Sequence, residues 1–196
     1  MTARNVFAAN KKREPSAGAG SGAGVAVGPP TLDRRFVRIA IVFAVTFGVL
    51  QGLLLAAAEY GLLEPVKAAT TAVADGLIGG TGVPCTRLGN EIFLASRVLR
   101  IDGECTGLLI VAMYLALLVA YPVSIKTKAI GLLVGVPVIL VVNMARLIAV
   151  AHLSERLTED AFRFAHDVLF KVVMVAVVLG LWAWWLAYAR DAAKRQ

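Results

Sequence analysis

Four long apolar runs alternate with polar segments along the chain. A helix needs about 20 residues to cross a hydrocarbon core about 30 Å thick, and each run reaches or approaches that length. The pattern predicts an all-α integral membrane protein with about four transmembrane helices: residues 36–58, 105–123, 129–150 and 166–189. The first run is longer than the apolar core of a cleaved signal peptide, which has about 7–15 residues, so we expect it to remain as a helix.

The segment between the first two runs carries a second pattern. Its apolar residues recur at spacings of three and four, as on one face of a helix: Leu62, Val66, Ala69, Val73 and Leu77. This spacing predicts an amphipathic helix that lies on the outer face of the membrane. Short apolar runs between Cys85 and Ile101, split at Gly89 and Asn90, predict a short β-hairpin that leads into the second long run.

The two ends of the chain have a different character. Residues 15–30 form a Gly, Ala, Ser and Pro tract without apolar periodicity, a composition that buries too little surface to fold. We therefore expect three parts: a disordered cytoplasmic tail at 1–33, a membrane-embedded domain at 34–190 and a short cytoplasmic tail at 191–196.

Composition agrees with a membrane protein. The chain is 59% hydrophobic, against about 45–50% apolar residues in soluble domains, and its mean hydropathy is +0.76. The net charge of +7 needs no nucleic-acid partner, because Lys and Arg accumulate in the cytoplasmic segments of membrane proteins. Membrane lipids are the partners that this composition implies.

Basic and acidic segments alternate with each predicted crossing. Residues 1–38 have seven basic residues against two acidic ones, and 124–128 have two against none. Residues 59–104 have six acids against four bases, and 151–165 have three against two. The alternation predicts cytoplasmic N- and C-termini and two outer segments. Three tryptophans at the inner end of the last run are typical of a lipid-facing interfacial belt: Trp182, Trp184 and Trp185.

Three chemically active side chains reach one predicted level. Cys105 lies 21 residues before Lys126, in the turn between the second and third runs, and Arg146 lies 20 residues after it. At about 1.5 Å rise per residue the two come to nearly the same height, and His166 begins the last run. Ionisable groups at such depths are candidates for a functional site. We therefore expect a thiol, a guanidinium and an imidazole to meet near the outer surface.

Such a trio suits acyl transfer. A thiolate is the nucleophilic form of cysteine, an imidazole accepts and returns a proton, and a guanidinium stabilises a developing oxyanion. Gly107 is expected to leave space beside Cys105, and Thr106 to cap the helix or bind the substrate backbone. Asn143 lies three residues before Arg146, on the same helix face, and is expected to orient the guanidinium.

Other interpretations of these residues stay open. Cys85 and Cys105 both fall on the outer side, where a structural disulfide can form. The chain would then be a non-enzymatic membrane helix bundle or a lipid-binding protein, with Arg146 at an anionic headgroup. A metal site is a further alternative, although its candidate ligands lack the close spacing typical of zinc sites: Cys85, Cys105, His152 and His166.

The order of these motifs resembles the exosortase/archaeosortase family. The matching motifs are CTG at 105–107, NMAR at 143–146 and the histidine at 166. The similarity covers roughly residues 60–189. Many members of that family have more transmembrane helices, so the chain resembles a short form that keeps the catalytic core.

The resemblance implies a fold and a function. It implies a polytopic membrane cysteine protease or transpeptidase that cleaves C-terminal sorting signals of exported proteins through a cysteine thioester. Such signals consist of a short motif, a transmembrane helix and a basic cluster. The catalytic residues implied are Cys105, Arg146 and His166, in a plasma or inner membrane with the site facing the extracytoplasmic side. We expect no cofactor, no metal and no nucleic acid.

Overall fold

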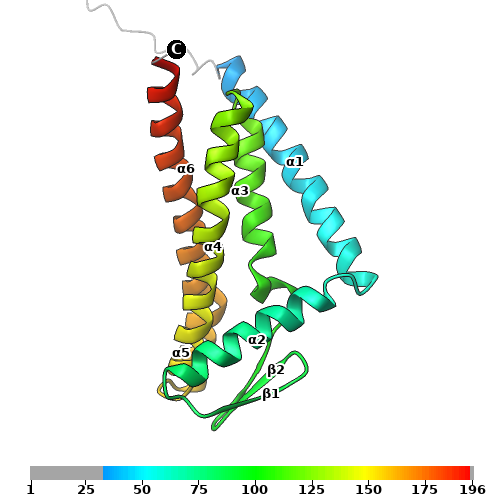
Figure 1. Cartoon of the computed structure of the whole chain (residues 1–196), viewed down its shortest axis with the longest axis vertical. Helices are drawn as coiled ribbons and strands as arrows, with labels where there is room; N and C mark the ends of the chain where they lie inside the picture. The colour runs from blue at the N-terminus through cyan, green and yellow to red at the C-terminus, as the bar shows by residue number, and fades with distance from the viewer. Residues whose placement is uncertain (1–32, 195–196) are drawn as a thin grey trace, which may run out of the picture. The chain divides into compact units, whose positions relative to one another are not determined.

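The computed structural model describes residues 33–194 and shows a mostly helical protein (Figure 1). Its α-helices are α1 Arg34–Glu59, α2 Glu64–Gly80, α3 Leu108–Ala120, α4 Ile125–Ser154, α5 Glu159–Phe164 and α6 Phe170–Lys194. The strands are β1 Cys85–Leu88, β2 Glu91–Leu94 and β3 Val98–Arg100. A 3-10 turn, Gly103–Thr106, precedes α3, and a π-helical turn, Ala165–Leu169, joins α5 to α6. The expected tail at 1–33 lies outside the described residues except for Asp33, and the expected tail at 191–196 is helical as far as Lys194.

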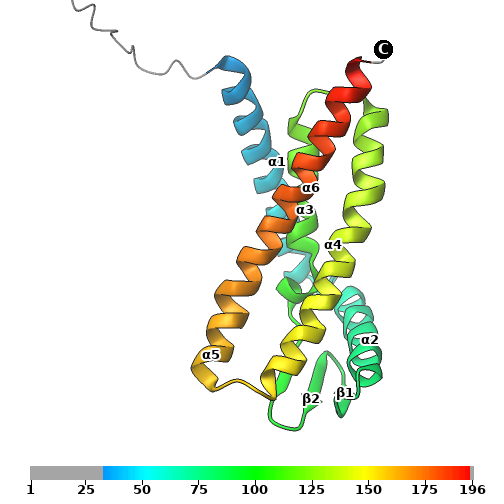
Figure 2. The same cartoon turned by 90° about the vertical axis from the view of Figure 1, so that its left-hand side faces the viewer.

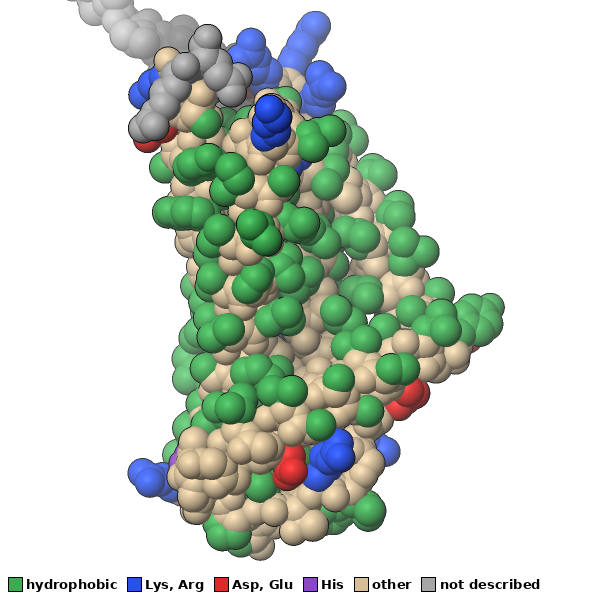
Figure 3. Space-filling model, in the orientation of Figure 1, with side chains coloured by type: hydrophobic (Ala, Val, Ile, Leu, Met, Phe, Trp, Pro, Cys, Tyr) green, Lys and Arg blue, Asp and Glu red, His purple; other side chains and the backbone are tan. Residues whose placement is uncertain are grey.

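The long helices run side by side between two ends of different composition. One end, here called the tail end, carries the start of α1, the α3–α4 turn and the end of α6 (Figures 1 and 2). The other, the loop end, carries α2, the three strands and α5 (Figures 1 and 2). Lys and Arg side chains gather at the tail end, and hydrophobic side chains cover the middle of the face shown in Figure 3. The charge segregation expected from the sequence is therefore present in space.

Three of the described helices are long and apolar enough to cross a membrane: Arg34–Glu59, Ile125–Ser154 and Phe170–Ala192. The remaining predicted span, 105–123, contains only the 13-residue helix α3. At 1.5 Å per residue α3 is about 20 Å long, which is less than a hydrocarbon core of about 30 Å. The helix is short because the preceding residues form the 3-10 turn and Tyr121, the residue before Pro122, is extended.

Helices α3, α4 and α6 enclose a hydrophobic core in the bundle. Two glycines of α4 make the close packing possible, since a Cβ at Gly131 would lie 2.6 Å from Nε1 of Trp185 and one at Gly135 would overlap the ring of Tyr114. The Tyr114 hydroxyl donates to the Gly131 carbonyl oxygen at 3.0 Å, and Trp185 Nε1 donates to the Thr127 carbonyl oxygen at 2.9 Å. Trp185 is fully buried, so its expected place in a lipid-facing belt is wrong.

A second core lies at the loop end, under α2 and the strands. The strands form an antiparallel sheet in the order β1-β2-β3, with Cys85 opposite Leu94 and Phe93 opposite Val98. The expected hairpin is thus present and has a third strand. Ile92 and Leu94 alternate with exposed residues and pack towards the ends of α2 and α4. The same core contains Cys105.

Helix α2 has two faces, as the spacing predicts. Thr71, Ala74 and Ile78 are buried against the loop-end core. The predicted apolar stripe points outward instead, with Leu62 68% exposed and Val73 53% exposed. A stripe that none of the described residues covers is available to a membrane surface.

We expect Gly135→Ala to destabilise the bundle. The new methyl group overlaps the buried Tyr114 ring, and overpacking of this kind costs about 1–3 kcal/mol, more than the helix-propensity gain of up to about 1 kcal/mol. The matched control is Gly180→Ala on α6, where a Cβ would meet nothing within 4 Å. Unfolding midpoints in detergent should fall for Gly135→Ala and stay level or rise for Gly180→Ala. Equal midpoints would contradict the packing described for α4.

Candidate active site

Cys105 is held in the 3-10 turn that joins the sheet to α3. Its backbone N donates to the Asp102 carbonyl oxygen at 2.9 Å, and the Thr106 hydroxyl donates to the Gly103 carbonyl oxygen at 2.6 Å. Because this turn ends at Thr106, Cys105 lies just before α3 and not in its first turn. Its side chain is buried, with 7% of the residue exposed. Thr106 also accepts a long hydrogen bond, 3.4 Å, from the backbone N of Leu108, but the N-cap residue of α3 is Gly107 and not Thr106.

Gly107 and Asn143 fit together behind the cysteine. Gly107 has φ +79°, a conformation that favours glycine. A Cβ at Gly107 would lie 3.2 Å from the amide of Asn143, so the space expected beside Cys105 is taken by Asn143. The fully buried Asn143 donates from Nδ2 to the Cys105 carbonyl oxygen at 2.7 Å. Helix α4 thereby holds the cysteine-bearing turn directly.

Arg146 stands next to Asn143 along α4 and is half-buried. One guanidinium nitrogen donates to Asn143 Oδ1 at 3.5 Å, at the long limit of a hydrogen bond. The Nε atom is buried and has no hydrogen-bond partner among the described residues. Burying a polar group without a partner is costly. This donor is therefore available to a group that enters the site.

One cavity of about 330 Å³ brings the three expected residues together. Cys105, Arg146 and His166 all line it, from the 3-10 turn, α4 and the π-helical turn. Apolar side chains of α1 form another part of the wall, among them Leu54 and Leu55. The convergence predicted from helix heights is thus confirmed as a shared cavity.

His166 is placed by an irregular helix. It lies in the π-helical turn Ala165–Leu169 rather than at the first residue of a regular helix, and such turns often occur at functional sites. Its ring stacks on that of Phe162, with centroids 6.0 Å apart. The guanidinium of Arg97 lies over the Phe162 ring, 4.4 Å from its centroid. The same guanidinium forms an ion pair with Glu159. The turn between β2 and β3 therefore contacts α5, the helix that leads into the histidine-bearing turn.

A second cavity, of about 260 Å³, adjoins the first. The two share Glu104, Leu109 and Arg146. The second is lined mainly by apolar side chains of α1, α3 and α6, and Glu104 pairs with Lys171 of α6 at 3.4 Å at its edge. Arg146 therefore stands between a cavity at the loop end and an apolar cavity within the bundle.

The structure keeps the other candidate ligands apart from this cavity. Cys85 and Cys105 are both free cysteines. The Cys85 thiol donates to Asp75 Oδ1 at 3.4 Å, and partial burial together with this carboxylate raises the pKa of the thiol. His152 instead contacts the Thr81 hydroxyl at 3.0 Å. Among the side chains that the structure describes, no three of His, Cys, Asp or Glu gather as a metal site would require, so neither the disulfide nor the metal alternative gains support.

Gln51 is a site residue that the sequence reasoning missed. It lies on α1, lines the cavity with Cys105, and its Oε1 is buried without a hydrogen-bond partner in the part of the chain that the structure describes. The available signal was an amide within the first apolar run. Burying a neutral amide in a membrane costs less free energy than burying a charge. A search for ionisable groups in the apolar runs therefore does not find Gln51.

Comparison with known proteins identifies the family. Residues 23–188 match the family model described as transmembrane exosortase (Exosortase_EpsH). Neither the curated proteins nor the solved structures contain a match to the chain. The family match includes every residue of the candidate site and extends over most of the sequence. The chain belongs to the transmembrane exosortase family.

Proposed function

We propose that this protein is a membrane cysteine transpeptidase or protease that cleaves C-terminal sorting signals of exported proteins through a thioester on Cys105. Membership of the exosortase family supports the class of activity. The observation that carries the assignment to residues is the single cavity lined by Cys105, Arg146 and His166. These side chains come from three segments far apart in sequence, and their types are those that acyl transfer requires.

The proposed reaction begins with attack of the Cys105 sulfur on the scissile carbonyl carbon. His166 takes the thiol proton as the C–S bond forms, and the tetrahedral intermediate collapses when the C–N bond breaks. The same proton passes from His166 to the leaving amine. An acceptor amine or water then attacks the thioester, gives a proton to His166, and the thiolate leaves and recovers that proton.

Arg146 is the proposed oxyanion donor. Its Nε–H is buried without a partner, and its terminal nitrogen contacts Asn143 only at 3.5 Å. A guanidinium has five N–H donors, so most of them remain for a developing negative oxygen. Donors fixed in advance at such a position are commonly the largest contribution to catalysis. Asn143 acts here as a positioning residue, since it bonds both the Cys105 carbonyl and Arg146.

The substrate is proposed to approach from within the membrane. Its cleavage segment would occupy the cavity of Cys105, where Gln51 Oε1 is available to accept a backbone N–H. Its transmembrane helix would lie towards the second cavity, whose lining includes the apolar Phe47, Met113 and Met174. Arg146 lines both cavities, so the scissile bond would lie at their junction.

The proposed orientation puts the tail end in the cytoplasm. Basic residues gather at that end (Figure 3), and such residues favour the cytoplasmic side. Both chain termini are then cytoplasmic in a multi-pass protein of the plasma or inner membrane, with four crossings when α3 and its flanking turns are counted as one. Cys105, Arg146 and His166 then face the extracytoplasmic side, where exported proteins arrive.

Cys105→Ala should abolish cleavage of a co-expressed sorting-signal protein while the variant still accumulates in the membrane. Cys85→Ala is the matched control and should leave cleavage nearly unchanged, because Cys85 lies outside the cavity and its raised pKa keeps it in the less nucleophilic thiol form. Immunoblots of substrate and enzyme from the same cells provide both readings. Equal loss from the two variants would instead indicate a shared structural role for the cysteines.

Single cysteines test the proposed orientation. In a background with Cys85→Ala and Cys105→Ala, a cysteine at exposed Thr81 or Glu159 should react with an impermeant maleimide on intact cells or spheroplasts. A cysteine at exposed Ser124 should react only after the membrane is permeabilised. Labelling of Ser124→Cys on intact cells would invert the orientation and place the cavity in the cytoplasm.

Arg146→Lys separates an oxyanion donor from a residue that only pairs with lipid headgroups. Lysine keeps the charge but lacks the planar fork of donors, and loss of one oxyanion donor costs about 10²–10³ in turnover in other enzymes. We therefore expect cleavage to slow at least about tenfold with unchanged membrane abundance. Arg163→Lys is the control, because the interaction of Arg163 among the described residues is an exposed ion pair with Glu159. Normal cleavage by Arg146→Lys would remove Arg146 from the catalytic set and support the headgroup interpretation.

A further inference from the structure

A cavity of about 670 Å³ lies at the tail end, far from the candidate active site along the helices. It is lined by the start of α1, the end of α3 with the following turn, the start of α4 and the end of α6. We call it the basic cavity, after its four cationic residues: Arg35, Arg38, Lys128 and Arg190. Much of the rest of its lining is apolar and includes Ile39, Val42 and Val119.

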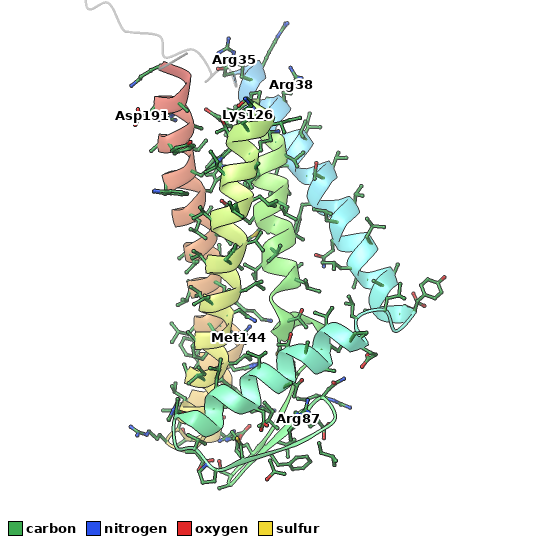
Figure 4. The ribbon with its side chains drawn as sticks, viewed as in Figure 1. Arg35, Arg38, Arg87, Lys126, Met144 and Asp191 are labelled. Carbon is green, nitrogen blue, oxygen red and sulfur yellow. The ribbon has the colours of Figure 1, made fainter. Side chains whose placement is uncertain are left out.

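The described part of the protein leaves the four cations without a neutralising carboxylate. Among the residues that the structure describes, no carboxylate lines the basic cavity, and none pairs with these four residues. The nearby acids are otherwise engaged: Asp33 caps α1 by accepting from the backbone N of Arg35 at 3.0 Å, and Asp191 pairs with Lys194 at 3.8 Å. In Figure 4 the side chain of Asp191 points away from α1.

One of the cations is fixed in place by the fold. Lys128 Nζ donates to the Val119 carbonyl oxygen at 2.8 Å, near the end of α3. The arginines come from α1 and α6, so the charges approach a common space from separate helices. Lys126, by contrast, belongs to the same short segment as Lys128 but does not line the cavity. Figure 4 shows Lys126 with Arg35 and Arg38 at this end of the bundle.

We propose that the basic cavity binds one anionic phospholipid, with the phosphodiester among the cations and the acyl chains along the apolar lining. Arginine forks match phosphate oxygens in geometry as well as charge, and basic pockets between transmembrane helices are typical sites for anionic headgroups. A zwitterionic lipid would bring its own ammonium group against four cations. A free phosphate would leave the apolar lining, such as Ile39 and Val42, without a partner.

The bound lipid would hold α1 against the bundle. Helix α1 has no buried residue and packs chiefly on α3. A headgroup that contacts Arg38 of α1 and Arg190 of α6 bridges two helices that both line this cavity. This assignment rests on the charges and the lining of the cavity and is independent of the proposed catalytic function.

The test is lipid retention by the purified full-length protein, measured by native mass spectrometry from detergent micelles that contain phosphatidylglycerol or phosphatidylcholine. The cavity variant is Arg38→Gln, Lys128→Gln, Arg190→Gln. The control variant, Arg34→Gln, Lys126→Gln, Lys194→Gln, removes the same charge from the same three parts of the chain but from residues that do not line the cavity. Circular dichroism and the unfolding midpoint in phosphatidylcholine micelles establish that both variants fold.

Wild type and control variant should each retain one phosphatidylglycerol in preference to phosphatidylcholine. The cavity variant should bind it at least about tenfold more weakly. If that variant does not fold, Arg190→Gln alone should show a smaller loss of the same selectivity. Equal weakening of phosphatidylglycerol binding in both triple variants would indicate general electrostatic attraction to the basic end and would overturn the proposal. Equal retention of phosphatidylcholine, or displacement of the lipid by an equimolar amount of inorganic phosphate, would overturn it as well.

Discussion

The side chain of Asn143, fully buried on α4, donates from its amide to the carbonyl oxygen of Cys105 at 2.7 Å. Leaving a buried polar group without its partner costs about 1–3 kcal/mol, so this bond fixes the cysteine-bearing turn against α4. It favours a glycine at 107, because the backbone there has φ +79° and a Cβ would lie 3.2 Å from the same amide. The Oδ1 atom of Asn143 accepts a long hydrogen bond from Arg146. The nucleophile candidate, its glycine and the guanidinium are therefore parts of one packed unit, which explains why their spacing in the sequence is informative.

Features set by depth along a helix were predictable from the sequence. Apolar run lengths gave α1, α4 and most of α6, and residue counts from Lys126 put Cys105 and Arg146 at one level, where they do share a cavity. The three short runs before Cys105 became the antiparallel strands. These inferences rest on hydropathy and on a fixed rise per residue. Hydropathy and rise do not depend on how the helices are rotated about their axes.

Features set by rotation and by local breaks in the backbone were not predictable. Trp185 is fully buried because the space above Gly131 admits its indole, a fit that involves α4 and α6 together. The 3-10 turn before α3 and the π-helical turn at His166 change hydrogen bonding without changing hydropathy. Gln51 enters the cavity only because α1 packs on α3. Such contacts depend on the tertiary arrangement rather than on any local pattern.

Helix α1 connects the two ends of the molecule, because its residues line both the candidate active-site cavity and the basic cavity. It has no buried residue of its own, so little apolar burial within the protein fixes its angle to α3. In lipid, apolar surface gives no net drive for helices to associate, and packing and polar contacts decide their positions. A small tilt of α1 about its contact with α3 would move Gln51 relative to Cys105. The position of α1 beside the candidate active-site cavity therefore depends on what holds its tail-end half, where Arg38 lies.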